Sequence, residues 1–302
     1  MLDAYPLIAV VGPTGSGKSA LALHLAVLFG GEIVNCDSVQ VYTGLDIGSA
    51  KTPVGQRFGV PHHLLDVIGA ESEMTAGDYA RHAGVVLEGI RGRGALPVIA
   101  GGTGFYLRAL LDGLSPAPKR NPELRARLAV VAQRRPGALH RFLKKGDAKA
   151  AARLHENDHQ KLIRAIEMAG TVQEERRGVQ GFRVLKIGLN PDRAALYEKL
   201  DRRCEWMFGN GLLEETRVLL ESGVSASAKA LGTLGYRQAL GVLSEGMSVA
   251  EAIAECQLRT RHYAKRQITW FRAEKELRWV NGFGGDEAVQ EEAAEMVRSF
   301  LR

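Results

Sequence analysis

Short apolar runs alternate with segments of helical periodicity along the first third of the chain. The apolar runs, each of strand length, lie at 7–11, 32–36, 63–67 and 95–100. Helical spacing of apolar residues follows at 20–28, 76–92 and 105–111. Because strands that are buried on both faces are short and mostly apolar, this alternation predicts a parallel α/β sheet covered by helices.

The pattern changes after Leu114-Ser115-Pro116-Ala117-Pro118. The next stretch, 119 to about 180, is rich in Arg and Lys and has helical repeats at 123–131 and 160–169. A strand pattern returns at 183–189, and the remainder is mostly helical. We therefore predict an α/β core over 1–116, a helical insertion over 117–182, and the second part of the core over 183–302.

A glycine-rich motif lies between the first apolar run and the first helix: Gly12-Pro13-Thr14-Gly15-Ser16-Gly17-Lys18-Ser19. Its glycines allow successive backbone N–H groups to point at an anion, and the helix N-terminus adds positive charge. Lys18 would supply a cation, and the Ser19 hydroxyl a ligand for Mg²⁺. The alternative is a surface turn, but strand, loop and helix in this order indicate a loop that binds a di- or triphosphate.

Two further segments follow predicted strands at the same edge of the sheet. Asp37 comes after 32–36, where it could bind Mg²⁺, accept a proton, or close a turn. Gly101-Gly102-Thr103-Gly104 follows 95–100, with no acid where P-loop ATPases usually carry one for Mg²⁺. This favours a small-molecule transferase over a motor-type NTPase.

Composition indicates a cytoplasmic protein. The chain has 302 residues, 45% apolar and 25% charged, and no apolar run near the ~20 residues that span a bilayer. Its N-terminus lacks the basic start of a secretion signal, and Cys36, Cys204 and Cys256 form no closely spaced pair. We expect neither a disulfide scaffold nor a zinc site.

The net charge of +6 and pI near 9.3 make a polyanionic partner plausible. Basic residues crowd 259–278, interleaved with Tyr263, Trp270, Phe271 and Trp279. Such interleaving favours RNA, although a solvated helix face would also explain it. His155 and His159 have only a superficial metal-ligand spacing, because Asn157-Asp158 between them is typical of a helix N-cap.

Several segments together resemble one family, the tRNA dimethylallyltransferases. They are the motif at 12–19, Asp37–Tyr42, Leu45–Lys51, Pro61–Asp66, Gly101–Tyr106, Leu231–Gln238 and Lys265–Arg272. The resemblance runs nearly end to end. It implies a P-loop NTPase-like fold, with the insertion gripping tRNA, and transfer of a dimethylallyl group from its diphosphate to N6 of the adenosine 3′-adjacent to the anticodon. It also implies a requirement for Mg²⁺.

The resemblance further implies roles for individual residues. Asp37 would be the catalytic base and Thr14 would lie near the bridging oxygen, while Lys18 and Arg164 would neutralise the diphosphate. The tRNA contacts it implies are Asp37, Ser38, Val39, Gln40, Thr103, Arg125, Gln160, Lys161, Arg164, Gly235, Tyr236, Arg237, Lys265, Arg266, Gln267, Trp270 and Arg272. The sequence departs from the family pattern at Glu156, His159 and Lys161, and Gly15 is often alanine elsewhere.

Two other functions share some of these features. A nucleoside- or shikimate-type kinase would have the phosphate loop and an Asp at a strand end, but no need for the basic-aromatic segment. A non-catalytic RNA-binding P-loop protein would leave Asp37 dispensable. We expect a monomer, without a membrane partner, whose partners are tRNA and dimethylallyl diphosphate.

Overall fold

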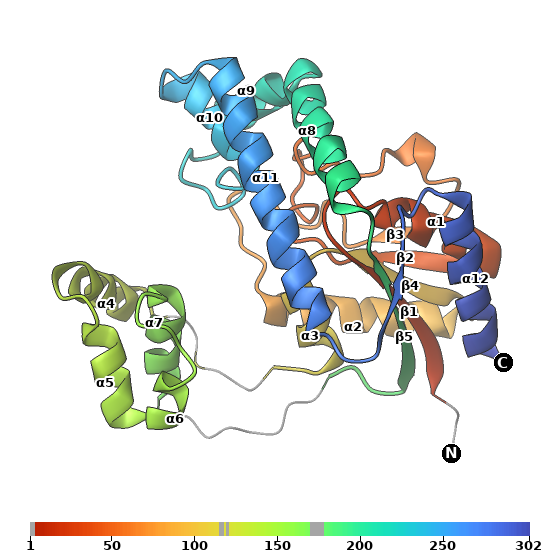
Figure 1. Cartoon of the computed structure of the whole chain (residues 1–302), viewed down its shortest axis with the longest axis horizontal. Helices are drawn as coiled ribbons and strands as arrows, with labels where there is room; N and C mark the ends of the chain where they lie inside the picture. The colour runs from red at the N-terminus through yellow and green to blue at the C-terminus, as the bar shows by residue number, and fades with distance from the viewer. Residues whose placement is uncertain (1–3, 115–117, 119–120, 170–177) are drawn as a thin grey trace. The chain divides into compact units, whose positions relative to one another are not determined.

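The computed structural model describes residues 4–114, 118, 121–169 and 178–302, and these form two compact units (Figure 1). The core unit comprises 1–113 and 178–302, and the insertion unit comprises 114–177. No helix among the described residues is long and apolar enough to cross a membrane.

The core unit is built on a six-stranded sheet in the order β3-β2-β4-β1-β5-β6, and every neighbouring pair of strands is parallel. Its strands are β1 (Tyr5–Val11), β2 (Gly31–Asn35), β3 (His62–His63), β4 (Leu96–Gly101), β5 (Phe182–Leu189) and β6 (Leu277–Val280). The predicted parallel α/β sheet is confirmed. Val11 at the end of β1 pairs with Gly101 of β4 and Gly188 of β5, so neighbouring strands end at one edge.

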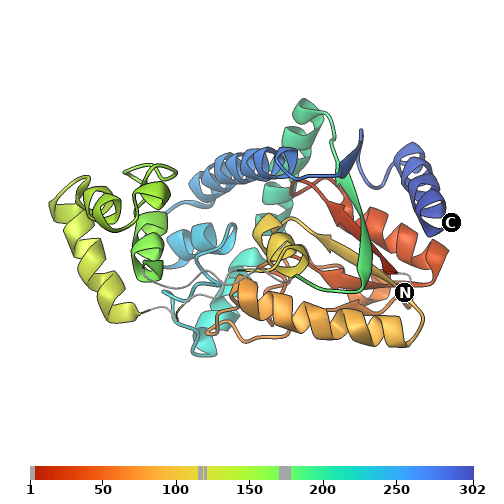
Figure 2. The same ribbon diagram turned by 90° about the horizontal axis from the view of Figure 1, so that it is seen from below.

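Helices cover both faces of this sheet (Figures 1 and 2). On one face, α1 (Lys18–Phe29) and α12 (Glu287–Leu301) bury Leu21, Leu25 and Val297 against the central strands. On the other face lie α2 (Ala76–Gly92) and α3 (Gly104–Leu111), where Tyr79 and Tyr106 stack with ring centroids 4.4 Å apart. Burial of apolar side chains on both faces explains why the strands lack polar alternation.

Four helices of the second half of the core unit lie beyond the carboxyl edge of the sheet. They are α8 (Arg193–Gly209), α9 (Leu212–Glu221), α10 (Tyr236–Ser244) and the long α11 (Val249–Arg272). Leu196 and Leu200 of α8 pack against Ala264 of α11. This packing fixes α11 beside the loops that follow the strands.

The insertion unit is helical and has a small apolar core of its own. Its helices are α4 (Pro122–Arg134), α5 (Ala138–Gly146), α6 (Ala148–Ala151) and α7 (His159–Met168). Leu139, Leu143 and Leu162 form the centre of that core. Asp158 caps α7 by accepting the Lys161 N–H, as its sequence context predicts.

Two elements differ from the sequence prediction. The prediction of a strand at 63–67 is wrong, because β3 ends at His63. Leu64 and Asp66 have φ of 61° and 56°, in the left-handed region that a strand does not accommodate. The short edge strand β6 was not predicted. The segment between β2 and β3 contains a 3₁₀ turn, Val54–Gln56.

Candidate active site

Three loops meet at the carboxyl edge of the sheet, where open parallel sheets bind ligands. The phosphate loop, 12–17, connects β1 to the N-terminus of α1, and Asp37 follows β2. The turn Gly101–Gly104 connects β4 to α3. Gly15 and Gly17 have φ of 80° and 87°, so the phosphate loop uses a backbone conformation that glycine adopts most easily.

Gln267 of α11 joins two of these loops. Its Oε1 accepts the Thr14 N–H at 2.7 Å, and its Nε2 donates to the Gly102 carbonyl oxygen at 2.9 Å. The side chain is buried, with 5% of its surface exposed. The resemblance implied a tRNA contact at Gln267, whereas the structure uses both ends of its amide to hold the phosphate loop against the β4 turn.

Two cationic side chains lie beside the phosphate loop. Lys18 Nζ donates to the Pro13 carbonyl oxygen at 2.7 Å, and burial lowers the pKa of Lys18 to about 8 despite the nearby charge of Asp37. Arg203 of α8 donates to Thr14 Oγ1 at 2.9 Å, and burial also lowers its pKa. Its Nε is buried without a hydrogen-bond partner among the described residues, so this guanidinium retains an unused donor at the loop.

Asp37 takes part in a turn and also faces the cations. Its Oδ1 accepts the Val39 N–H at 2.9 Å, which is the turn role that sequence analysis left open. Its charge also acts on Lys18 and Arg203. The next residue, Ser38, donates its N–H to Thr103 Oγ1 at 3.0 Å, which connects the Asp37 turn to the β4 turn.

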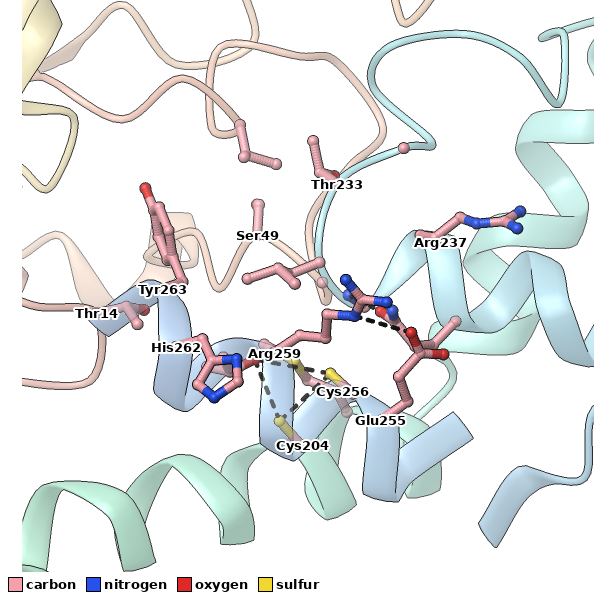
Figure 3. Close-up of a pocket in the computed structure, with 18 of the residues that line it drawn as sticks. Thr14, Ser49, Cys204, Thr233, Arg237, Glu255, Cys256, Arg259, His262 and Tyr263 are labelled. Atoms are coloured by element: carbon pink, nitrogen blue, oxygen red, sulfur yellow. Dashed lines mark hydrogen bonds and ion pairs between the residues drawn. The ribbon is translucent and has the colours of Figure 1, made fainter. Parts of the chain in front are cut away.

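A cavity of about 750 Å³ opens beside these loops, within the core unit (Figure 3). Arg203, Cys204, Cys256 and Tyr263, from α8 and α11, form part of its wall. Of the residues proposed from sequence, it is lined by Thr14, Asp37, Ser38, Val39, Gly235, Arg237 and Arg266. The fold therefore brings residues separated by more than two hundred positions to one site.

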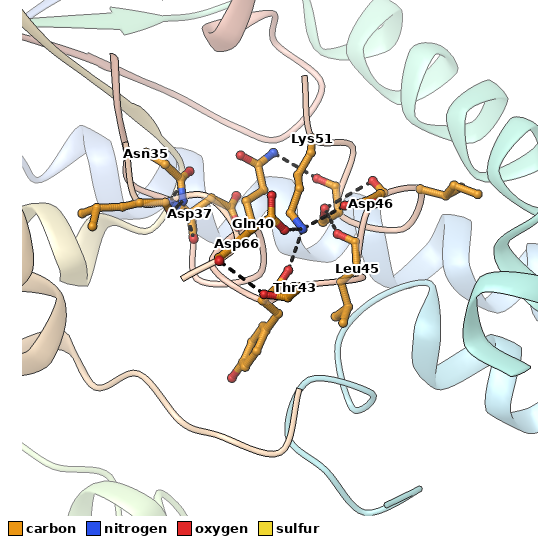
Figure 4. Close-up of polar contacts among 12 residues, drawn as sticks. Asn35, Asp37, Gln40, Thr43, Leu45, Asp46, Lys51 and Asp66 are labelled. Carbon is orange, nitrogen blue, oxygen red and sulfur yellow. Dashed lines mark hydrogen bonds and ion pairs between the residues drawn. The ribbon is translucent and has the colours of Figure 1, made fainter. Parts of the chain in front are cut away.

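The segment that follows Asp37 is held at Lys51 (Figure 4). The buried Lys51 ammonium donates to Tyr42 O at 2.6 Å, to Asp46 Oδ1 at 3.0 Å and to Asp66 Oδ1 at 2.5 Å. Gln40, implied as a tRNA contact, donates through Nε2 to Ser49 O at 3.1 Å. Lys51 thus fixes the loop whose residues 48 and 49 line the cavity.

Glu215 of α9 holds the same loop from the other side. Its carboxylate accepts backbone N–H groups from Asp46 at 3.1 Å and Ile47 at 2.9 Å, and it also accepts the Tyr236 hydroxyl. Tyr236 is fully buried, and burial beside Glu215 raises the pKa of its phenol. Tyr236, which the resemblance implied as a tRNA contact, therefore supports the cavity wall from inside.

The basic segment at the C-terminal end of α11 exposes its charged side chains but buries part of its aromatic side chains. Lys265, Arg266 and Arg272 are exposed, but Phe271 is 1% exposed and lies in the core, so it cannot stack on an RNA base. Trp270 is half-buried beneath Arg108, whose guanidinium carbon lies 4.3 Å from the ring centroid. Of the three aromatic residues in this part of α11, Phe271 is buried, Trp270 is half-buried, and Tyr263 is half-buried in the cavity wall.

The remaining predicted residues lie in the insertion unit. Arg125 Nε and Arg164 Nη1 bond Glu167 at 2.8 Å and 3.1 Å, and these partners lower the pKa of Glu167 to about 2. Lys161 pairs with Asp158 at 2.5 Å, and Gln160 is exposed. Glu167 thus orients both arginines within this unit.

Ser19 is the residue best suited to a Mg²⁺ ion here. It lies in the first turn of α1, directly after Lys18, and is exposed at the end of the phosphate loop. Mg²⁺ prefers six oxygen ligands and usually retains several waters. One hydroxyl fits this chemistry when diphosphate oxygens and water complete the coordination.

These features define the class of the protein: a P-loop NTPase-like fold with a phosphate loop, an Asp at the neighbouring strand end and a side cavity. Comparison with known proteins identifies the family. The family described as IPP transferase matches residues 40–274, and the one described as isopentenyl transferase matches 5–58. The chain belongs to the IPP transferase family, and its members named below are tRNA dimethylallyltransferases and isopentenyltransferases.

Relatives match along nearly their whole length. The tRNA dimethylallyltransferase of Solibacter usitatus is 51% identical over 98% of this chain and 99% of its own, and that of Koribacter versatilis is 50% identical over 97% and 98%. The structure of the tRNA isopentenylpyrophosphate transferase of Bacillus halodurans is 32% identical, covers 98% of this chain and 95% of its own, and has a TM-score of 0.73. The structure of a eukaryotic dimethylallyltransferase acting on tRNA is 25% identical and has a TM-score of 0.79. It covers 98% of this chain and 78% of its own.

Gly284 supports the phosphate loop, and this contact can be tested with a matched control at Gly285. Gly284 donates its N–H to Ser16 O at 2.9 Å, and a Cβ on Gly284 would collide with the Gly17 carbonyl oxygen. We expect Gly284→Ala to displace the loop and lower turnover by about 10- to 100-fold. Gly285→Ala, where an added Cβ meets nothing within 4 Å, should retain activity. Equal activities of the two variants would contradict this support.

Arg203 gives a second test. Loss of its charged hydrogen-bond donors should weaken binding of inorganic diphosphate by about 10- to 100-fold in Arg203→Met, measured by calorimetry. The neighbouring Arg202 is exposed and pairs with Glu198 in the same helix, at 3.3 Å, so Arg202→Met is the control. If both variants bind diphosphate alike, Arg203 does not contribute to anion binding.

Proposed function

We propose that this protein transfers a dimethylallyl group from dimethylallyl diphosphate to N6 of the adenosine that follows the tRNA anticodon. One observation carries the proposal: Thr14 of the phosphate loop, Arg203 and Asp37 line one cavity, and the ammonium of Lys18 is held at the same loop by the Pro13 carbonyl oxygen. Family membership supplies the reaction class, and this arrangement supplies the groups that the reaction needs.

The leaving group requires positive charge. As the bond between the allylic carbon and oxygen breaks, negative charge accumulates on the diphosphate. Lys18, Arg203 and the N–H groups of the phosphate loop offset that charge from half-buried positions, where electrostatic interactions are stronger than in bulk water. Ser19 would hold Mg²⁺, which as a Lewis acid stabilises the same charge when it is bound. The role at the diphosphate that the resemblance implies for Arg164 stays a prediction.

The nucleophile requires a proton acceptor. The adenine N6 amine is weakly nucleophilic because its lone pair is delocalised into the ring. In our proposal its nitrogen forms a bond to the allylic carbon while its proton passes to the Asp37 carboxylate. The adenine must leave its stack to reach the cavity, which is the usual solution for enzymes that modify a base.

Asp37→Asn separates the two roles of this residue. The asparagine oxygen can still accept the Val39 N–H, so the turn persists, but it cannot accept a proton. We expect turnover to fall by about 10²- to 10⁴-fold while tRNA affinity changes by less than about tenfold. Single-turnover kinetics and filter binding measure the two quantities. Activity near that of the unchanged protein would leave Asp37 only its role in the turn.

The lowered pKa of Lys18 predicts that diphosphate binding depends on pH. Its pKa is lowered to about 8, and only the protonated amine attracts the anion. Affinity should therefore be highest below pH 8 and weaken as the pH rises through that value. Lys18→Met lacks the amine, so its affinity for diphosphate should lose this dependence on pH. The titration of diphosphate itself affects both proteins alike, so the comparison isolates the contribution of Lys18. Parallel pH profiles for the two proteins between pH 6.5 and 9.5 would contradict the assignment.

The reaction itself is tested with labelled substrates. The purified protein receives radiolabelled dimethylallyl diphosphate or γ-labelled ATP, each with and without unmodified tRNA and Mg²⁺. Transfer of the allyl label to tRNA, lost in Asp37→Asn, is the expected result. Transfer of phosphate from ATP to a small acceptor, with tRNA inert, would instead establish a kinase.

A further inference from the structure

Two cysteines in the cavity wall have no part in the proposed reaction. Cys204 of α8 and Cys256 of α11 lie with their Sγ atoms 3.4 Å apart, and Cys256 donates a thiol hydrogen bond to Cys204 (Figure 3). The Thr260 hydroxyl lies 3.8 Å from Cys204 Sγ and 3.9 Å from Cys256 Sγ. Both thiols are free.

The cavity gives small molecules access to this pair. Both residues line the cavity, although they are only 1% and 2% exposed overall. Hydrogen bonding from Cys256 lowers the pKa of Cys204, which favours the thiolate at Cys204 over Cys256. The third cysteine, Cys36, does not line this cavity, and burial raises its pKa to about 12. The chain therefore contains its own unreactive reference thiol.

We propose that Cys204 and Cys256 form a reversible disulfide when a hydroperoxide enters the cavity, and that this disulfide slows catalysis. The Cys204 thiolate attacks the peroxide, so that an S–O bond forms and the O–O bond breaks. The leaving oxygen takes up from solvent the proton that Cys204 lost on ionisation, and departs as an alcohol or water. The Cys256 thiol then attacks the sulfenic sulfur, an S–S bond forms and water leaves with the Cys256 proton. Two thiols lose two electrons, which reduce the hydroperoxide.

The geometry connects this bond to the phosphate loop. A disulfide is about 2.05 Å long, so the sulfurs must approach each other by roughly 1.4 Å from their separation of 3.4 Å. This movement draws α8 and α11 together at the residue next to Arg203. Because Arg203 donates to Thr14 Oγ1, the phosphate loop is affected. The effect on catalysis rests on the proposed function, whereas formation of the bond does not.

Formation of the disulfide is tested by mapping which cysteines become linked in the intact chain. The folded protein is treated with hydrogen peroxide, the remaining thiols are alkylated, and a non-reducing tryptic digest is analysed by mass spectrometry. We expect a linked pair of peptides, 204–217 with 238–259, which dithiothreitol separates. Cys36→Ala should form the same link. Links through Cys36, links between chains, or alkylated Cys204 and Cys256 after peroxide treatment would overturn the proposal.

The effect of the disulfide on catalysis is tested by comparing the rate of tRNA prenylation with and without peroxide. We expect prenylation to fall at least about fivefold on oxidation and to recover with dithiothreitol, which reduces disulfides but not methionine sulfoxide. Cys204→Ser and Cys256→Ala should each abolish this response. A mapped disulfide without loss of activity would remove the regulatory role, whereas absence of prenylation from the untreated protein would refute the proposed function alone.

Discussion

The amide of Gln267 is the contact on which the site depends. It pairs the part-buried Thr14 N–H and the buried Gly102 carbonyl oxygen, which belong to the loops after two adjacent strands. An unsatisfied buried amide group costs about 1–3 kcal/mol, so the contact favours one relative position of the two loops. It also fixes the rotation of α11, which places Tyr263, one turn earlier, in the cavity wall.

Most of the fold could be predicted because its signals are local. The runs at 7–11 and 95–100 and the helical pattern at 76–92 agree with β1, β4 and α2 within two residues at each end. The prediction at 63–67 was wrong because an apolar run gives no sign of left-handed backbone at Leu64 and Asp66. The edge strand β6 is only four residues long and contains Arg278, and such short mixed segments carry little strand signal.

The site was predictable only where its residues are contiguous or belong to a family motif. The phosphate loop and Asp37 could be identified from their places after strands. Arg203 and Glu215 could not, because each lies on an ordinary amphipathic helix and acquires its role from a partner 189 or 168 residues away. Gln267 could be located through the resemblance, but its burial, and hence its use within the protein, became visible only in the folded chain.

Desolvation of Lys18 and Arg203 connects binding to catalysis. Both residues are half-buried, burial lowers the pKa of each, and the charge of Arg203 further lowers the pKa of Lys18. In the proposed function, an incoming diphosphate supplies negative charge that favours the charged forms of both side chains. In the proposed reaction, the same cations stabilise the additional negative charge that the leaving group gains as its bond to carbon breaks. In the proposed reaction, Asp37 takes up a proton at that stage and loses its own negative charge, so the repulsion between it and the diphosphate decreases as the product forms.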